Sequence, residues 1–247
     1  MHIGDGIKNV FESQNTYVMK INLKNYLSDR DKSLHRPVVP GPVITISRAY
    51  GCDEHELVKS LIKRLNQLRD SGLKSHTWKY INKEIIEESA KQLKMQAYDL
   101  ENRVMVHHEP QSDWFANFDT HPKHSDTEII DTIKDMITTY AKKGNVIIIG
   151  RGGIGVVKSM PNSLHIRLNA PLDYRIGLIS RQMNMNPMDA EEMIRSIDNQ
   201  RRKWSEHLVE RPIEDGVFDL IFNTERLSVE EMTDQIVNLL TSRKLVG

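Results

Sequence analysis

Short apolar runs that alternate with helical patterns constrain the fold of this chain more than any other feature of its sequence. Five such runs are short and largely apolar, and they occupy residues 43–47, 76–81, 146–150, 164–168 and 218–222. Apolar residues recur with helical spacing in the segments 54–68, 83–93, 127–142, 172–183, 187–207 and 229–240. Strands that are separated by helices pair in parallel, and a parallel sheet needs helices on both faces. The sequence therefore predicts an α/β fold in which a five-stranded parallel sheet lies between two layers of helices.

The N-terminal stretch does not follow this alternation. Residues 1–36 have an imperfect helical pattern, and the proline-rich residues 37–42 join them to the first strand as an extended, stiff linker. We expect residues 1–36 to form a helical arm on a domain that covers residues 43–247. Three roles of the arm stay open: packing on its own domain, self-association into a homo-oligomer, and binding of a partner protein.

A second stretch, from about residue 106 to residue 126, is polar, aperiodic and rich in histidine and proline. We expect it to form a long loop inserted in the domain. His121 and His124 have a spacing that metal sites use, and Asp119 and Asp126 flank them. No cysteine joins these residues, and such spacings arise by chance in polar loops, so we predict no metal site here.

Composition restricts the class of protein. The formal net charge is zero at pH 7, which argues against a nucleic-acid binder held by bulk charge. The longest apolar run, residues 146–149, is far too short to cross a bilayer, and the first residues lack the apolar core of a signal peptide. Cys52 is the only cysteine, so no intramolecular disulfide can form, which fits a reducing compartment. We expect a cytoplasmic protein that binds neither nucleic acid nor membrane.

The loop between the first strand and its helix, residues 47–54 (SRAYGCDE), is the first candidate site. In mononucleotide-binding folds, the helix N-terminus that follows such a loop can hold a phosphate. This loop has one glycine, Gly51, and Asp53 and Glu56 carry negative charge where an anion would approach. The two acids also have the spacing of a capping pair, so we expect Asp53 to accept hydrogen bonds from amides of its own helix.

A second candidate site follows the apolar run at 146–149, where the chain reads Gly150-Arg151-Gly152-Gly153. Ligands of α/β folds bind at the carboxyl ends of strands, and glycines there let the backbone approach a ligand closely. The planar guanidinium of Arg151 suits a phosphate. A surface arginine in a tight turn is the alternative, and we favour the phosphate-binding role.

Two later helices supply further charged residues. Arg175 and Arg181 lie on the helix that begins near residue 172, and kinases of small nucleotides bring such arginines to a transferring phosphoryl group. For Arg181 a solvated position is a comparable alternative. Asp198 and Arg201 are i, i+3 neighbours on the next helix. They form either a surface ion pair worth about 0.3 kcal/mol or a carboxylate that orients an arginine toward an anionic substrate.

Six segments, in this order, resemble the cytidylate kinase-like family of nucleoside monophosphate kinases, within the P-loop superfamily. They are ITISRAYG (44–51), WKYINKEIIEESA (78–90), NVIIIGRGG (145–153), LHIRLNAPLDYRI (164–176), DNQRRKW (198–204) and FDLIFNTERLSVEEM (218–232). The arm and the histidine-rich stretch lie outside the pattern. The resemblance implies a three-layer α/β/α P-loop kinase-like fold. It also implies a transferase that uses ATP and Mg²⁺ as phosphoryl donor and a pyrimidine nucleoside monophosphate such as CMP as acceptor.

The resemblance implies roles for individual residues as well. The residues of the phosphate loop, on the ATP side, would be Ser47, Arg48, Gly51, Cys52, Asp53, Glu54 and His55. The catalytic cations would be Arg151, Arg175 and Arg181, and the acceptor nucleotide would contact Asn82, Arg151, Asp198 and Arg201.

The chain departs from the family pattern in the phosphate loop. Family members typically read Ser-Gly-Gly-Arg where this chain reads Cys52-Asp53-Glu54-His55, so two glycines and one cation are replaced. An acidic residue that family members have after the second strand is Asn82 here.

Two functions therefore stay open. The chain is either a kinase in which arginines supply the charge that the loop has lost, or a weak or inactive relative. Such a relative would keep a nucleotide or phosphate site for regulation or interaction. An unrelated α/β enzyme would need a nucleophile and a base that the sequence does not offer, and no G-x-S-x-G motif is present.

Overall fold

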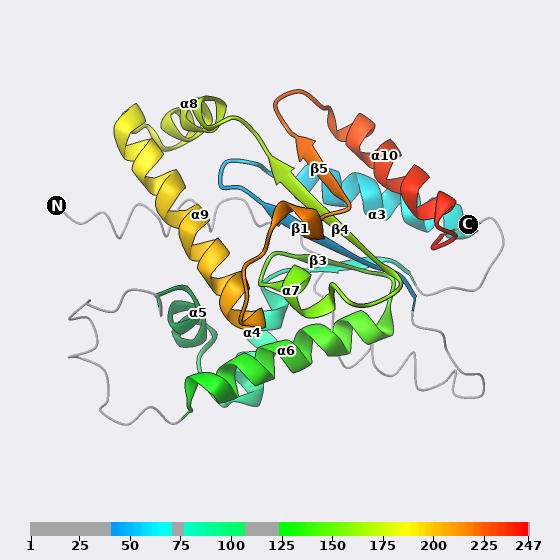
Figure 1. Ribbon diagram of the computed structural model, residues 1–247, viewed down its shortest axis with the longest axis horizontal. Coiled ribbons are helices and arrows are strands. Elements are labelled where there is room, and N and C mark those ends of the chain that lie inside the picture. Colours follow the sequence, from blue (N-terminus) through cyan, green and yellow to red (C-terminus); the bar gives the residue numbers. More distant parts are fainter. Residues whose placement is uncertain (1–40, 71–76, 107–123, 247) are drawn as a thin grey trace. The chain divides into compact units, whose positions relative to one another are not determined.

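The structure, a computed structural model, describes residues 41–70, 77–106 and 124–246. Within these ranges, five strands form one sheet in the order β2-β3-β1-β4-β5, and every neighbouring pair is parallel (Figure 1). The strands are β1 (Val43–Arg48), β2 (Lys79–Ile81), β3 (Val146–Ile149), β4 (Ser163–Asn169) and β5 (Leu220–Asn223). In the central strand β1, Thr45 is in register with Ile148 of β3 and His165 of β4.

Helices cover both faces of the sheet, so the predicted three-layer α/β/α fold with a five-stranded parallel sheet is confirmed (Figure 1). The helices are α3 (His55–Asp70), α4 (Glu84–Gln92), α5 (Ala97–Val106), α6 (Asp126–Lys143), α7 (Gly153–Val157), α8 (Leu172–Met183), α9 (Pro187–Val209) and α10 (Val229–Ser242), with a short 3₁₀ turn at η2 (Asp215–Val217). α3 and α10 pack together on one face, and α6 and α7 lie on the other. α8 and α9 pack on each other, and α5 packs on α4 and α9. None of the helices within the described ranges is long and apolar enough to span a membrane.

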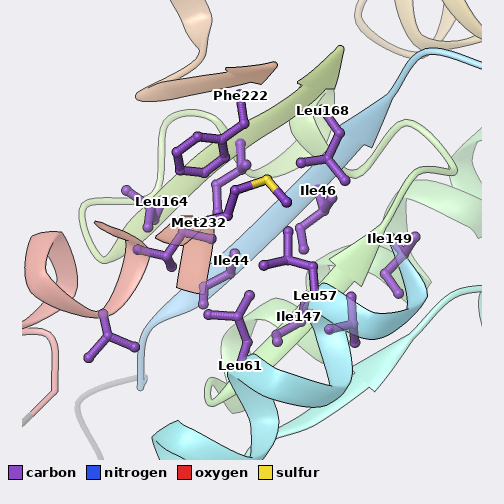
Figure 2. Packing of buried hydrophobic residues seen from close by; sticks show 14 of the residues in the cluster. Ile44, Ile46, Leu57, Leu61, Ile147, Ile149, Leu164, Leu168, Phe222 and Met232 are labelled. Atoms are coloured by element: carbon purple, nitrogen blue, oxygen red, sulfur yellow. The ribbon is translucent and has the colours of Figure 1, made fainter. Parts of the chain in front are cut away.

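The core between the sheet and the layer of α3 and α10 uses alternate residues of the strands. Ile44 and Ile46 of β1 are fully buried and lie against Leu57 and Leu61 of α3 (Figure 2). Burial of each such side chain contributes about 1.5–3 kcal/mol to stability. This packing fixes the position of β1, and with it the point where the loop after β1 leaves the sheet.

Several helices begin at residues that cap them. Ser228 and Glu231 form a reciprocal capping box at the start of α10. The Asn186 side chain accepts a hydrogen bond from the first turn of α9, and Pro187 occupies the first helical position. These signals explain why both helices begin at the predicted residues, 187 and 229.

Two helices, α5 and α7, were not predicted from the sequence. α5 (AYDLENRVMV) mixes apolar and polar residues without a strong helical period, and α7 has only five residues, so the spacing of apolar residues does not reveal either helix. Val106, where we expected the histidine-rich loop to begin, is instead the last residue of α5. His107, His108 and His121, like residues 1–36 of the expected arm, lie outside the described residues.

Candidate functional site

The carboxyl ends of β1, β3 and β4 lie at one edge of the sheet, where α/β folds bind their ligands. From this edge, β1 continues into the loop that ends before α3, β3 continues into Gly150 and Arg151, and β4 continues toward α8. We call residues 47–54 the 47–54 loop. The topology therefore brings three of the segments singled out from the sequence to one place.

Two helices hold the 47–54 loop through the peptide groups of Tyr50. The Tyr50 N–H donates to Oδ1 of Asp198 on α9 at 2.6 Å, and the Tyr50 carbonyl accepts from Nη1 of Arg175 on α8 at 3.0 Å. Arg175 Nη1 also lies 2.7 Å from Asp198 Oδ2, and its Nε donates to the carbonyl of Ala170 at 3.1 Å. We call Tyr50, Arg175 and Asp198 the Tyr50 clasp. Because Arg175 is buried, its charge depends on the Asp198 carboxylate for compensation.

The side chain of Tyr50 anchors the loop to the same two helices. Its hydroxyl points to the sulfur atoms of Met183 and Met193, at 3.9 and 3.8 Å, and its ring packs against the apolar cluster around Ile194. The guanidinium carbon of Arg201 lies 5.5 Å from the ring centroid, within cation–π range. Burial raises the pKa of the Tyr50 hydroxyl, so the ring stays neutral.

Arg48, at the end of β1, forms an ion pair inside the loop. Its Nε lies 2.6 Å from Oε2 of Glu54, and the two side chains are 18% and 15% exposed. On its other side, Arg48 approaches Gly150, whose φ is +61°. This left-handed conformation favours glycine, and a Cβ atom there would lie 3.0 Å from Nη1 at the end of the Arg48 side chain.

Arg201 of α9 lies next to Arg48. Its Nη1 donates to the Arg48 carbonyl at 3.2 Å. Burial and the nearby Arg48 charge lower the pKa of Arg201 to about 10, and Asp198 and Glu54 only partly oppose this shift. Two adjacent, poorly solvated guanidinium groups attract an anion.

The two other acids of this region face away from the arginines. Asp53 Oδ1 accepts a hydrogen bond from the His55 N–H at 2.9 Å, as the capping pattern predicts. Glu56 does not reach back to complete the capping box but pairs with Lys59 at 3.0 Å, and both side chains are exposed. The loop therefore directs one carboxylate, that of Glu54, toward Arg48.

Gly51 and Cys52 have structural roles in the loop. Gly51 has a φ of +90°, and a Cβ there would lie 3.2 Å from Cβ of Arg175, so the left-handed turn and the close approach both favour glycine. Cys52 is buried in the core, and burial raises the pKa of its thiol. A raised pKa disfavours the thiolate, so Cys52 is not an activated nucleophile.

Arg151 follows β3 with a φ of +53°, and its side chain is 14% exposed. Its Nη2 lies 2.6 Å from Oε1 of Glu101 on α5. Its Nη1 is buried and has no hydrogen-bond partner within the described residues. Buried guanidinium N–H groups normally have acceptors, so this one is available to a ligand oxygen.

The structure does not join every predicted site residue to this cluster. Asn82 follows β2, and its N–H donates to Oε2 of Glu84 at 2.8 Å. Arg181 is exposed in the last turn of α8, and Ser47 is partly buried near the end of β1. Within the described residues, no hydrogen bond or ion pair joins Asn82 or Arg181 to Arg48, Arg151 or Arg201.

Sequence reasoning missed two residues that shape the site. Tyr50 lies inside a predicted loop, but an aromatic residue there carries no signal that its peptide groups bind two distant helices. Glu101 belongs to α5, which has no recognisable period, and so nothing pointed to its pairing with Arg151.

Known proteins resemble this chain in sequence pattern and in fold. The pattern of the cytidylate kinase-like family matches residues 43–226. An uncharacterized protein from Eubacterium ventriosum has a similar fold, with a TM-score of 0.56 and 18% sequence identity, over 81% of this chain and 98% of that chain. Shikimate kinase from Bacteroides thetaiotaomicron matches with a TM-score of 0.47 and 12% identity, over 81% and 98% of the two chains.

A partial sequence match is also found among curated proteins. A uronate isomerase from Corynebacterium glutamicum is 26% identical over 105 residues, which is 42% of this chain and 20% of that protein. The chain thus matches about a fifth of the length of this curated relative. The family match is far more extensive, because residues 43–226 include all five strands of the described sheet together with the 47–54 loop, Arg151 and the Tyr50 clasp. The chain therefore belongs to the cytidylate kinase-like family and is a nucleotide kinase-like protein.

Proposed function

We propose that this protein transfers a phosphoryl group from ATP, bound with Mg²⁺, to a pyrimidine nucleoside monophosphate such as CMP. The observation that carries the proposal is the pair of adjacent guanidinium groups, Arg48 and Arg201, beside the 47–54 loop. Family membership supports the class of reaction, and the choice of CMP follows the family's description.

Different arginines would bind the phosphates of the two nucleotides. Phosphoryl transfer depends mainly on positioning and on positive charge around the phosphates. Arg48 would bind phosphates of ATP at the 47–54 loop, and Arg201 beside it would contact the acceptor nucleotide. Arg151 would bind the phosphate of the acceptor through its available Nη1. Arg175 would act by holding the loop in place through the Tyr50 clasp.

Mg²⁺ fits this site as a partner of ATP rather than as a metal held by the protein alone. The described residues contain no group of three or more His, Cys, Asp or Glu side chains that could hold a metal. Mg²⁺ bound to ATP keeps several waters and is coordinated mainly by phosphate oxygens. Ser47, at the end of β1, would supply a protein hydroxyl, and the metal would neutralise charge on the phosphates.

The test is formation of CDP from Mg·ATP and CMP by the purified full chain. Replacement of Arg151 by Ala should lower the rate of CDP formation at least about 100-fold, the usual cost of losing a cation at the reacting group. Arg195→Ala is the matched control, because Arg195 is exposed on α9 and pairs with Glu191. A native protein that is folded and forms no CDP, dCDP or UDP would contradict the proposal.

One observation favours a second candidate function, a nucleotide-binding relative without turnover. Three arginines of the site already hold carboxylates of the same chain: Arg48 with Glu54, Arg151 with Glu101 and Arg175 with Asp198. Such a protein would show a higher unfolding midpoint with CMP by mass action. It would form no product when Mg·ATP is added.

We also infer a cytoplasmic location. The substrates proposed here are nucleotides, and the single cysteine, Cys52, is buried as a free thiol. When cells are fractionated, we expect the protein in the same fraction as the cytoplasmic enzymes of nucleotide metabolism.

A further inference from the structure

Glu54 differs from its acidic neighbours in where its carboxylate goes. Asp53 caps the first turn of α3, and Glu56 pairs with Lys59 on the surface. Glu54 instead turns back over the loop and contacts Arg48 at 2.6 Å.

The Glu54–Arg48 pair has the properties of a strong contact. Both side chains are less than one fifth exposed, at 15% and 18%, so water screens the attraction only weakly. The Arg48 carbonyl also accepts a hydrogen bond from Arg201 Nη1 at 3.2 Å, so the backbone that carries the Arg48 side chain is held by α9. A carboxylate and a phosphate use the same guanidinium N–H donors, so they compete for Arg48.

We propose that the Glu54 carboxylate is an internal competitor for Arg48, which a phosphate ligand of the 47–54 loop must displace. Glu54 is thus a specificity-determining residue of this site. It lowers the affinity for every polyphosphate and leaves the loop selective for ligands that offer enough negative charge to replace a carboxylate. The inference rests on the proposed function for the statement that phosphates bind at this loop.

The experiment is calorimetric titration of the full chain with tripolyphosphate, a probe without base or sugar. Glu54→Gln keeps the size of the side chain and removes its charge. We expect its dissociation constant for tripolyphosphate to be about tenfold lower than that of the native protein, which corresponds to about 1.4 kcal/mol. Glu56→Gln is the matched control, since it removes the same charge from an exposed residue two positions along, and it should change the constant by less than about twofold. In the double variant Arg48→Gln/Glu54→Gln, the increase in affinity for tripolyphosphate should be abolished.

The proposal would be overturned if Glu54→Gln bound tripolyphosphate no more tightly than Glu56→Gln. It would also be overturned if Glu54→Gln bound tripolyphosphate more weakly than the native protein, or did not bind it. The unfolding midpoint of each variant is measured in parallel, and Glu54→Ala is a second variant in which the carboxylate is also gone. If both Glu54 variants bind tripolyphosphate tightly and no protein forms CDP, the role of Glu54 as a competitor is supported and the proposed kinase activity is refuted. If CDP is formed and the Glu54 variants bind tripolyphosphate as the native protein does, the kinase activity is supported and the role of Glu54 as a competitor is refuted.

Discussion

At the scale of single residues, Asp198 joins three elements of the site. Its carboxylate accepts hydrogen bonds from the Tyr50 N–H of the 47–54 loop and from Arg175 of α8, while the residue itself lies on α9. The sequence led us to expect a pairing with Arg201, its i+3 neighbour. The direct contact is with Arg175, because the rotation of α9 turns the carboxylate toward α8.

Asp198→Asn should destabilise the protein by about 2 kcal/mol, because it leaves the buried Arg175 without a counter-charge. The value is at the low end for a broken buried pair, since the Asp198 side chain is 30% exposed. Chemical denaturation of the variant would measure the change. Glu192→Gln makes the same chemical change on an exposed residue of α9 and should cost less than about 0.5 kcal/mol. Equal stability of the two variants would contradict this reading of the clasp.

His165 predicts a dependence of stability on pH. Its ring nitrogens lie 2.8 Å from the Thr45 hydroxyl and 3.0 Å from the Ser163 hydroxyl, and the residue is 5% exposed. Burial lowers the pKa of His165, and the nearby Asp219 only partly opposes this shift. The unfolded state therefore binds a proton more readily than the folded state does.

The contribution of His165 to stability should be complete above about pH 6.5, the pKa of an unfolded histidine, and should be lost as the pH falls. Denaturation curves recorded between pH 8 and pH 5 would show this loss in the native protein. The loss should be smaller in a His165→Gln variant, and replacement of the exposed His207 by Gln should leave it unchanged. A curve for His165→Gln parallel to the native one would rule out this residue as the cause.

At the scale of elements, the ends of α10 allow a local test of helix stability. Ser228→Ala removes the hydroxyl that accepts a hydrogen bond from the Glu231 N–H at 3.2 Å, and with it the capping box. We expect a loss of about 1 kcal/mol in the free energy of unfolding. Ser242→Ala, at the other end of the same helix, should have less than half that effect. Similar losses from both substitutions would show that the capping box contributes nothing specific.

The way in which each element is stabilised explains whether it could be predicted from the sequence. β1 and β3 are buried on both faces, so short runs of β-branched residues predicted them, whereas β4 was predicted from the alternate apolar residues Leu164, Ile166 and Leu168. α5 packs on α4 and α9, and its apolar and polar residues do not follow a strong helical period, so the sequence did not reveal it. The arginines of the site could be located from their positions at strand and helix ends. Their carboxylate partners could not, because these come from elements whose rotation and contacts depend on the whole fold.

At the scale of the whole molecule, the predicted arm of residues 1–36 lies outside the described residues, and the predicted domain can be tested without it. We expect a chain that begins at residue 41 to keep the folded domain, with its unfolding midpoint within a few degrees of the full chain. Circular dichroism and thermal unfolding would check this. Light scattering of both proteins would test whether the arm mediates dimerisation. If it does, the full chain should have twice its monomer mass and the shortened chain should not. A shortened chain that does not fold would contradict the predicted division between arm and domain.

The Tyr50 clasp also has a consequence for folding. The hydrogen bond from Tyr50 to Asp198 joins residues 148 positions apart in the sequence. Contacts between such distant residues form late, after the intervening segments have collapsed and paired. During synthesis, β1 leaves the ribosome long before α9, so the 47–54 loop stays unclasped until most of the chain has been made. The newly made protein can thus build much of its sheet before it acquires a site that is able to bind a nucleotide.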